Sequence, residues 1–168
     1  IYMSVAELSG TNVFDVGYEI TQMLEADLKE VVEIEEATGL SRWGYEAYKM
    51  ELFNNPMSIM RVARGLTEID GRYRILGFVA SRVTFDELHI NNIATHPDFR
   101  RMRIGSELLK NVIRQSYGYG ARRCLLEVRV TNEPAQRLYE RLGFRVIGRR
   151  RDYYTQPTED ALVMQVIY

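Results

Sequence analysis

One stretch near the middle of the chain, residues 93–106 (IATHPDFRRMRIGS), restricts the possible folds more than any other. It reads as the end of a β-strand, a turn at residues 96–98 and the start of a helix. Beyond the turn, apolar residues recur at helical spacing: Ile104, Leu108, Leu109, Val112 and Ile113. A strand that turns directly into an amphipathic helix indicates a domain in which helices pack on a sheet.

Three arginines and a glycine lie where this strand becomes the helix. The first N–H groups of a helix lack intrahelical partners, and the helix dipole makes that end weakly positive. A turn that leads into a helix N-terminus therefore suits an anion, and adjacent arginines suit phosphate. The spacing alone leaves an alternative of similar weight, a basic helix start with solvated arginines.

The periodicities along the rest of the chain predict one α/β domain, for which 168 residues are sufficient. They follow the order strand, helix, helix, three strands, helix, strand, helix, two strands, which predicts a mixed sheet with helices on both faces. The expected helices cover residues 25–38, 41–52, 103–117 and 133–142. The expected strands cover residues 18–24, 57–63, 75–83, 87–95, 123–130, 144–148 and 161–167.

Charge is distributed unevenly along the chain. Residues 1–60 hold 3 Lys/Arg and 11 Asp/Glu, whereas residues 97–151 hold 14 Lys/Arg and 5 Asp/Glu. A basic half of this kind suits a polyanion, either nucleic acid or a phosphate-rich cofactor. Because the basic residues are scattered among core periodicities rather than stacked with aromatics, we expect no requirement for nucleic acid.

Several classes of protein are disfavoured by what the sequence lacks. Cys124 is the only cysteine, so an internal disulfide is excluded and a reducing compartment fits. No apolar run approaches the roughly 18 residues of a membrane span, and the first residues resemble no secretory signal. His89 and His96 are isolated and lack metal-ligand spacing. We therefore expect a cytoplasmic protein with no membrane contact and no metal.

The turn and its surroundings resemble a known family. Arg100-x-x-Arg103-x-Gly105 is similar to the acyl-CoA loop of the GCN5-related N-acetyltransferases (GNAT), Gln/Arg-x-x-Gly-x-Gly/Ala. Further segments resemble RimI-type protein N-terminal acetyltransferases: residues 126–132 (LEVRVTN), 138–144 (LYERLGF), 152–154 (DYY) and 159–161 (EDA). The resemblance covers residues 18–168, the expected GNAT domain, and leaves residues 1–17 as an N-terminal extension or tail.

One position departs from the family's loop. Arg103 stands where the family mostly has glycine, which lets the backbone approach a pyrophosphate closely. We expect Arg103 to adopt ordinary helical geometry, with its N–H still available and its side chain turned aside.

The resemblance implies a GNAT fold, with a mixed, mostly antiparallel sheet splayed at an acetyl-CoA site. Backbone groups of Ile93, Ala94 and Thr95 would pair with the pantetheine arm and serve the thioester oxygen. Asn132 would contact the cofactor and also cap the following helix. The phosphates would lie against the loop and helix start, formed by Arg100, Arg101, Met102, Arg103, Ile104, Gly105 and Ser106.

Acetyl transfer from a thioester to an amine needs a proton acceptor and a proton donor. By resemblance, Glu127 is the base, acting through water, and Tyr139 contacts the cofactor and donates to the coenzyme A sulfur. The alternatives are a structural ion pair between Glu127 and Arg129, and an ordinary packed tyrosine at Tyr139.

The resemblance also implies substrate contacts by Trp43, Tyr153 and Tyr154, the last two in a peptide-contacting loop. Arg42 precedes Trp43 where the family often has proline. The arginines at 149–151 suit an acidic peptide or ribosomal surface, although such charges are commonly only solvated.

We therefore expect an acetyl-CoA-dependent N-acetyltransferase that acts on a protein N-terminal α-amine by direct transfer in a ternary complex. The expected partner is a protein or peptide N-terminus, with a ribosomal protein among the candidates, and the enzyme is expected to be a monomer or weak homodimer. The alternatives are an acetyltransferase for a small amine or a lysine side chain, and a non-catalytic acyl-CoA-binding module.

Overall fold

The computed structural model describes residues 17–40, 42–66 and 73–168. Three expectations fall outside these ranges. They are the helix cap at Ser41, the turn near Asp70 and Gly71, and almost all of the N-terminal extension at residues 1–17.

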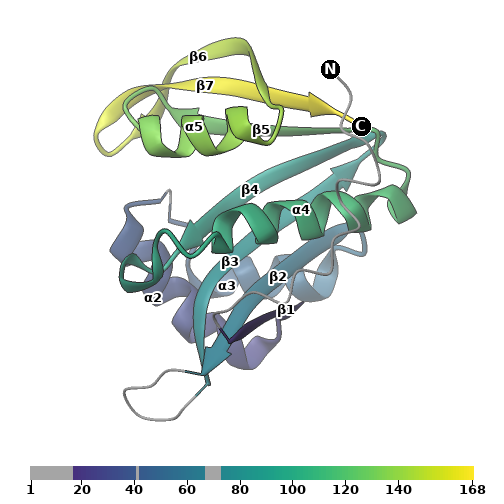
Figure 1. Cartoon of the computed structure of the whole chain (residues 1–168), viewed down its shortest axis with the longest axis vertical. Coiled ribbons are helices and arrows are strands. Elements are labelled where there is room, and N and C mark those ends of the chain that lie inside the picture. The colour runs from purple at the N-terminus through teal and green to yellow at the C-terminus, as the bar shows by residue number, and fades with distance from the viewer. Residues whose placement is uncertain (1–16, 41, 67–72) are drawn as a thin grey trace.

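Seven strands form one sheet in the order β1-β2-β3-β4-β5-β7-β6 (Figure 1). They are β1 (Tyr18–Gln22), β2 (Ser58–Leu66), β3 (Tyr73–Thr84), β4 (Glu87–Thr95), β5 (Arg123–Arg129), β6 (Arg145–Thr155) and β7 (Thr158–Ile167). Every neighbouring pair is antiparallel except β4 and β5, which run parallel. The expected mixed, mostly antiparallel sheet is confirmed.

Helices cover both faces of this sheet, as predicted (Figure 1). They are α2 (Leu28–Thr38), α3 (Gly44–Asn54), α4 (Ile104–Ser116) and α5 (Glu133–Arg141), with short 3-10 turns η1 (Glu25–Asp27), η2 (Pro97–Phe99) and η3 (Tyr117–Tyr119). Residues of α4 and α5 belong to one hydrophobic core, and residues of α2 and α3 belong to a second. None of the helices in the described ranges is long and apolar enough to cross a membrane.

The apolar residues that recur at helical spacing from Ile104 onward form a buried stripe on α4. Its apolar residues are all at most 1% exposed: Ile104, Leu108, Leu109, Val112 and Ile113. Burial of each such side chain stabilises the fold by roughly 1.5–3 kcal/mol. This packing holds the N-terminus of α4 against the sheet.

The close approach of α4 depends on a glycine in the neighbouring strand. A Cβ built at Gly77 would lie 2.8 Å from the carbonyl oxygen of Ala94 and 2.9 Å from Cγ2 of Ile104. Real Cβ atoms essentially never approach so closely. Gly77 therefore allows the first residue of α4 to pack directly on β3 and β4.

The sheet splits between its two parallel strands. Their pairing covers only Glu87–Ile90 opposite Arg123–Leu126. At the same level, Ala80 pairs with Asn92 and Ser81 with Ile90, so Asn91 is an extra residue in β4. Because such a bulge bends a strand, β4 leaves β5 here while it stays paired with β3. The splay that the family resemblance implies is thus present.

Two local expectations were wrong. Arg103 has φ 60° and ψ 9°, the left-handed conformation, so α4 begins at Ile104 and Arg103 is not in helical geometry. The penultimate strand does not stop at Gly148 but continues to Thr155, so Tyr153 and Tyr154 lie in a strand rather than a loop. Its run of arginines carries no apolar alternation, which is why the sequence pattern did not reveal it.

Candidate active site

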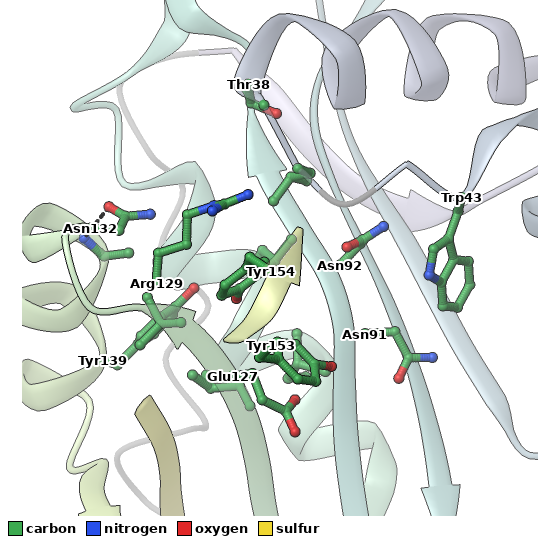
Figure 2. A pocket seen from close by; sticks show the side chains of 17 residues that line it. Thr38, Trp43, Asn91, Asn92, Glu127, Arg129, Asn132, Tyr139, Tyr153 and Tyr154 are labelled. Atoms are coloured by element: carbon green, nitrogen blue, oxygen red, sulfur yellow. Dashed lines mark hydrogen bonds between the residues drawn. The ribbon is translucent and has the colours of Figure 1, made fainter. Parts of the chain in front are cut away.

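A pocket of about 210 Å³ lies where β4 and β5 diverge (Figure 2). This volume exceeds that of a single ion or water by several fold, since a water in the liquid takes up about 30 Å³. The two strands supply opposite walls, α5 and the end of β6 contribute aromatic rings, and the segment after α2 covers another side. The side chains that line it include Trp43, Ile93, Glu127, Arg129, Asn132, Tyr139, Tyr153 and Tyr154.

Glu127 enters the pocket from β5, one residue beyond the last parallel pair with β4. Its carboxylate oxygen lies 3.3 Å from Nη1 of Arg150, and its side chain is 23% exposed. The alternative partner suggested by the sequence was wrong, because Arg129 pairs with Glu159 at 3.2 Å. A partly exposed carboxylate at the mouth of a pocket can accept a proton directly or through water.

Tyr139 enters the same pocket from α5 and is 7% exposed (Figure 2). Its ring packs against Phe144, with centroids 5.9 Å apart. Burial raises the pKa of the Tyr139 phenol above its ordinary value. The hydroxyl therefore stays protonated at neutral pH, which is the state that a proton donor needs.

Asn132 caps the N-terminus of α5, the helix that carries Tyr139. Its side-chain oxygen accepts from the N–H of Ala135 at 3.3 Å, so the predicted cap is present. The same residue lines the pocket, so capping and contact with a ligand are compatible (Figure 2).

The loop before α4 has the features of an anion site. Arg101 and Arg103 both have positive φ, at 65° and 60°. Left-handed residues interleaved with others turn backbone N–H groups towards a common concavity. Among the described residues no side chain caps the N-terminus of α4, so the N–H groups of its first turn remain available. The hydroxyl of Tyr18 donates to the carbonyl of Met102 at 3.4 Å and ties this loop to β1.

The last residues of β4 leave one backbone edge unpaired on the side of β5, and Ile93 of this edge lines the pocket. Ile93, Ala94 and Thr95 pair with β3 on their other side, opposite Val79, Phe78 and Gly77. In the described part of β5, no residue pairs with them. Their remaining N–H and C=O groups can therefore pair with an extended ligand as a strand would.

These features fit the cofactor that the family resemblance implies. The free edge of β4 suits the amide groups of a pantetheine arm, and the uncapped start of α4 suits a pyrophosphate. A Cβ at Gly105 would lie 3.7 Å from the side chains of both Leu138 and Thr95. These are ordinary van der Waals distances, and they place Gly105 beside α5 and the end of β4. Arg100, Arg101 and Arg103 are all exposed beside it.

Tyr153 and Tyr154 lie against each other at the end of β6, with perpendicular rings 5.1 Å apart. Burial, and secondarily Tyr153, raises the pKa of Tyr154 to about 12. The guanidinium of Arg129 lies 4.1 Å from the centre of the Tyr154 ring and also donates to the carbonyls of Gln156 and Pro157. Arg129 therefore holds the β6–β7 hairpin over the pocket.

Trp43 lines the opposite side of the pocket from Tyr139 (Figure 2). Its ring packs at a tilt of 40° against Tyr48, and its backbone N–H donates to Glu35 at 2.8 Å. Glu35 is 1% exposed and also accepts from Gly44 N–H, the Tyr48 hydroxyl and the Asn92 amide. One buried carboxylate thus connects α2, the start of α3 and the bulge of β4.

Sequence reasoning missed Glu35, Gly77 and the contact between Arg150 and Glu127. Glu35 is a charged residue on the apolar side of α2, four residues after Val31, which was a usable signal. Gly77 carried no local signal, because its role depends on a contact with a distant helix. Within the described ranges, no group of three or more His, Cys, Asp and Glu side chains is placed to bind a metal ion.

Comparison with known proteins relates this fold and pocket to acetyltransferases. A family model described as Acetyltransferase (GNAT) family matches residues 28–144. A Bacillus subtilis relative, named as a candidate ribosomal protein bS18-alanine N-acetyltransferase, is 35% identical over 147 residues, which are 88% of this chain and 93% of the relative.

Two solved structures of acetyltransferases have a similar fold. The crystal structure of the ribosomal-protein-S18-alanine N-acetyltransferase from Escherichia coli has a TM-score of 0.75 and 28% identity, covering 89% of this chain and 93% of that chain. Arabidopsis thaliana NAA60 in complex with acetyl-CoA has a TM-score of 0.79 at 20% identity, covering 89% and 98%, and is similar in fold.

Proposed function

The chain belongs to the GNAT acetyltransferase family, and we propose that it transfers an acetyl group from acetyl-CoA to the N-terminal α-amine of a protein. The transfer is direct, within a ternary complex. The observation that carries this proposal is that Glu127 and Tyr139 line one pocket at the point where β4 and β5 separate. An acceptor and a donor for protons thus lie beside a backbone edge that an extended ligand can use.

In this proposal each residue does one task. Glu127 accepts the proton of the substrate ammonium, directly or through water, so that the amine becomes neutral. The neutral amine forms the new carbon–nitrogen bond, and Tyr139 donates a proton to the sulfur as the carbon–sulfur bond breaks. The second proton, which the nitrogen loses on becoming an amide, restores the phenol. Burial keeps the Tyr139 hydroxyl protonated until it donates. The N–H groups of β4 at residues 93–95 provide donors for a developing negative charge on oxygen. Acetyl-CoA, when bound, supplies the acetyl group as an activated thioester.

The cofactor would be held along a line from β4 to α4. Ile93, Ala94 and Thr95 would pair with the pantetheine arm through their backbone. The phosphates would lie at the loop of residues 100–106, where N–H groups and arginines meet. Asn132 and Tyr139 would contact the cofactor from α5.

The substrate side is proposed to be formed by Trp43, Tyr153 and Tyr154, which line the pocket away from the α4 loop. Names of relatives support a protein acceptor, since they describe N-acetyltransferases that act on an alanine of ribosomal protein S18. A ribosomal protein is accordingly the first substrate to test. An α-amine has a pKa of about 8, against about 10.4 for lysine, so it needs less help to lose its proton.

Three further expectations belong to the proposal. Residues 18–168 form the acetyltransferase domain, preceded by an extension at residues 1–17. The enzyme acts as a monomer or weak homodimer. It acts in the cytoplasm, where acetyl-CoA and newly synthesised proteins occur together.

The test is release of coenzyme A from acetyl-CoA in the presence of paired short peptides, one with a free and one with a blocked N-terminus. Each pair is made with and without lysine. We expect turnover only with free N-termini, whether or not lysine is present. Turnover on blocked peptides that contain lysine would instead identify a side-chain acetyltransferase. If acetyl-CoA binds but no peptide is acetylated, the protein is instead an acetyltransferase for a small amine or a non-catalytic acyl-CoA-binding module.

A further inference from the structure

Arg150 is a cation that lies beside the proposed base, Glu127, and it has no role in the proposed reaction. Nη1 of Arg150 on β6 is 3.3 Å from Oε1 of Glu127, and its guanidinium carbon is 5.4 Å from the centre of the Tyr153 ring. The side chain is 57% exposed. Arg150 thus lies between the carboxylate that meets the amine and an aromatic residue of the substrate side.

The backbone of β6 fixes this placement. Arg150 pairs with Ala161 of β7. The regular pairing of β6 with β7 is then interrupted and resumes at Tyr154. Within this interruption, Asp152 has φ 48°, and its N–H donates to Asp160 at 2.9 Å. Bulges of this kind commonly redirect side chains next to functional sites.

The neighbouring arginines differ from Arg150. Arg149 donates to the carboxylate of Asp160 at 2.6 Å and is committed to the bulge. Arg129 lines the pocket but is engaged by Glu159, two carbonyls of the hairpin and the Tyr154 ring. Of Arg129, Arg149 and Arg150, Arg150 is therefore the cation best placed to meet a substrate.

Arg150 also has capacity for a second partner. A guanidinium has five N–H donors, and the contact with Glu127 involves one terminal nitrogen. Exposed ion pairs of this type are weak, so a second carboxylate can share the cation or displace the first. A substrate carboxylate arriving here would gain a charge-assisted hydrogen bond.

The chain geometry of a substrate sets which residue would meet Arg150. An amine that contacts Glu127 lies within a few ångströms of the guanidinium. Each further residue of an extended peptide adds about 3.3–3.6 Å. The side chains of the first two residues are thus within reach of a long arginine, and basic side chains there would be repelled.

We propose that Arg150 selects substrates that carry an acidic side chain within their first two residues. This inference rests on the proposed function, because it assigns the substrate class of the same site. Wild-type enzyme would prefer acidic over neutral and neutral over basic peptides. The preference would depend on the charge at position 150.

The experiment compares peptides that differ only by Glu, Gln or Lys at the second residue and, in a second series, at the first. The enzymes are wild type, Arg150→Gln and Arg150→Glu, with Arg145→Gln as the matched control. Arg145 is an exposed arginine of the same strand, about 15 Å further along it. Both kcat/KM and equilibrium binding of each peptide in the presence of coenzyme A are measured.

We expect wild type and Arg145→Gln to favour Glu over Gln peptides by up to about fivefold, the value of an exposed ion pair. Arg150→Gln should abolish this ratio, and Arg150→Glu should invert it towards Lys peptides. Ratios between peptides cancel any general effect of the substitution on Glu127.

Equal use of all peptides by wild type would overturn the inference, as would a preference for Glu that survives in Arg150→Gln. The binding measurement separates this inference from the proposed function. Charge-dependent binding without turnover would support the role of Arg150 and contradict the proposed reaction. Turnover without charge preference would support the proposed reaction and contradict the role of Arg150.

Discussion

The carboxylate of Glu35 accepts a hydrogen bond from the hydroxyl of Tyr48 at 2.7 Å, inside the core between α2, α3 and β4. Both residues are essentially buried, and Asn92 donates to each of them. Because Glu35 also receives the N–H groups of Trp43 and Gly44, it links the core to the substrate side of the pocket.

Substitution Glu35→Gln should lower the free energy of unfolding by about 1–3 kcal/mol, since an amide cannot accept from all of these donors. It should raise KM for the peptide while the affinity for acetyl-CoA changes little, because Trp43 shifts and the α4 loop does not. Thermal unfolding and separate titrations of the two substrates measure this. Glu36→Gln, at the exposed neighbouring position, is the control and should have no effect on either. A uniform loss of both affinities would contradict a local positioning role.

Substitution Glu127→Gln should reduce kcat by about 100-fold or more, the usual effect of losing a general base. Binding of acetyl-CoA should persist, because the loop before α4 and the edge of β4 are unchanged. Coenzyme A release and equilibrium binding measure the two effects. An unchanged rate would remove Glu127 from the mechanism.

Substitution Tyr139→Phe keeps the ring that packs on Phe144 and removes only the donor, so kcat should fall about 100-fold with little loss of stability. Burial raises the pKa of Tyr139, so its donating form persists to higher pH than that of an ordinary phenol. The ratio of wild-type to Tyr139→Phe kcat should therefore stay constant up to pH about 10. A ratio that declines within this range would argue against Tyr139 as the donor.

Substitution Gly77→Ala should destabilise the protein by about 1–3 kcal/mol, since the new Cβ overpacks the contact between β3, Ala94 and Ile104. It should also weaken acetyl-CoA binding, because the displaced start of α4 carries the anion site. Gly148→Ala is the matched control in a strand, with the nearest atom to the new Cβ at 4.0 Å. Chemical denaturation and cofactor titration compare the two variants, and equal behaviour would refute this role for Gly77.

Alkaline pH should unfold the protein through its buried tyrosines. Burial, followed by the hydrogen bond to Glu35, raises the pKa of Tyr48, and burial followed by Glu107 raises that of Tyr18 to about 12. A phenol whose pKa is higher in the folded than in the unfolded protein stabilises the fold while it stays protonated. This contribution to the free energy of unfolding is fully present below the unfolded-state pKa of about 10, and it declines as the pH rises above that value. Melting temperatures between pH about 8 and 12, with phenolate absorbance, measure the decline. A Tyr48→Phe variant should show a shallower slope.

The sequence predicted the order of elements because each strand and helix carries its own periodicity. Stripes such as Leu108, Leu109 and Val112 are local signals, and all three residues are buried as expected. Motif resemblance then indicated which side chains face a common pocket, including Glu127 and Tyr139. What escaped prediction depended on contacts between distant segments.

Arg103 and Arg150 illustrate that limit. Nothing in the sequence around Arg103 predicts a left-handed arginine, because tertiary contacts hold the loop in a conformation that glycine would adopt without strain. Arg150 lies 23 residues after Glu127 in the chain, and the two meet only because β5 and β6 flank β7. A polar run such as residues 149–151 carries no periodicity that would indicate this strand.

An open sheet normally has two edges, but the early end of the β4–β5 ladder gives this one two more, inside the molecule. Unpaired strand edges usually invite association with other chains. Here the gap between the strands closes at Ile90 and Leu126, and residues of α5 and of the segment after α2 line it as well. A gap of this shape suits one extended chain better than a second sheet. On the surface of a protein, the early end of a strand ladder would promote aggregation. Inside this molecule, the early end of the β4–β5 pairing instead favours the binding of an extended, flexible molecule.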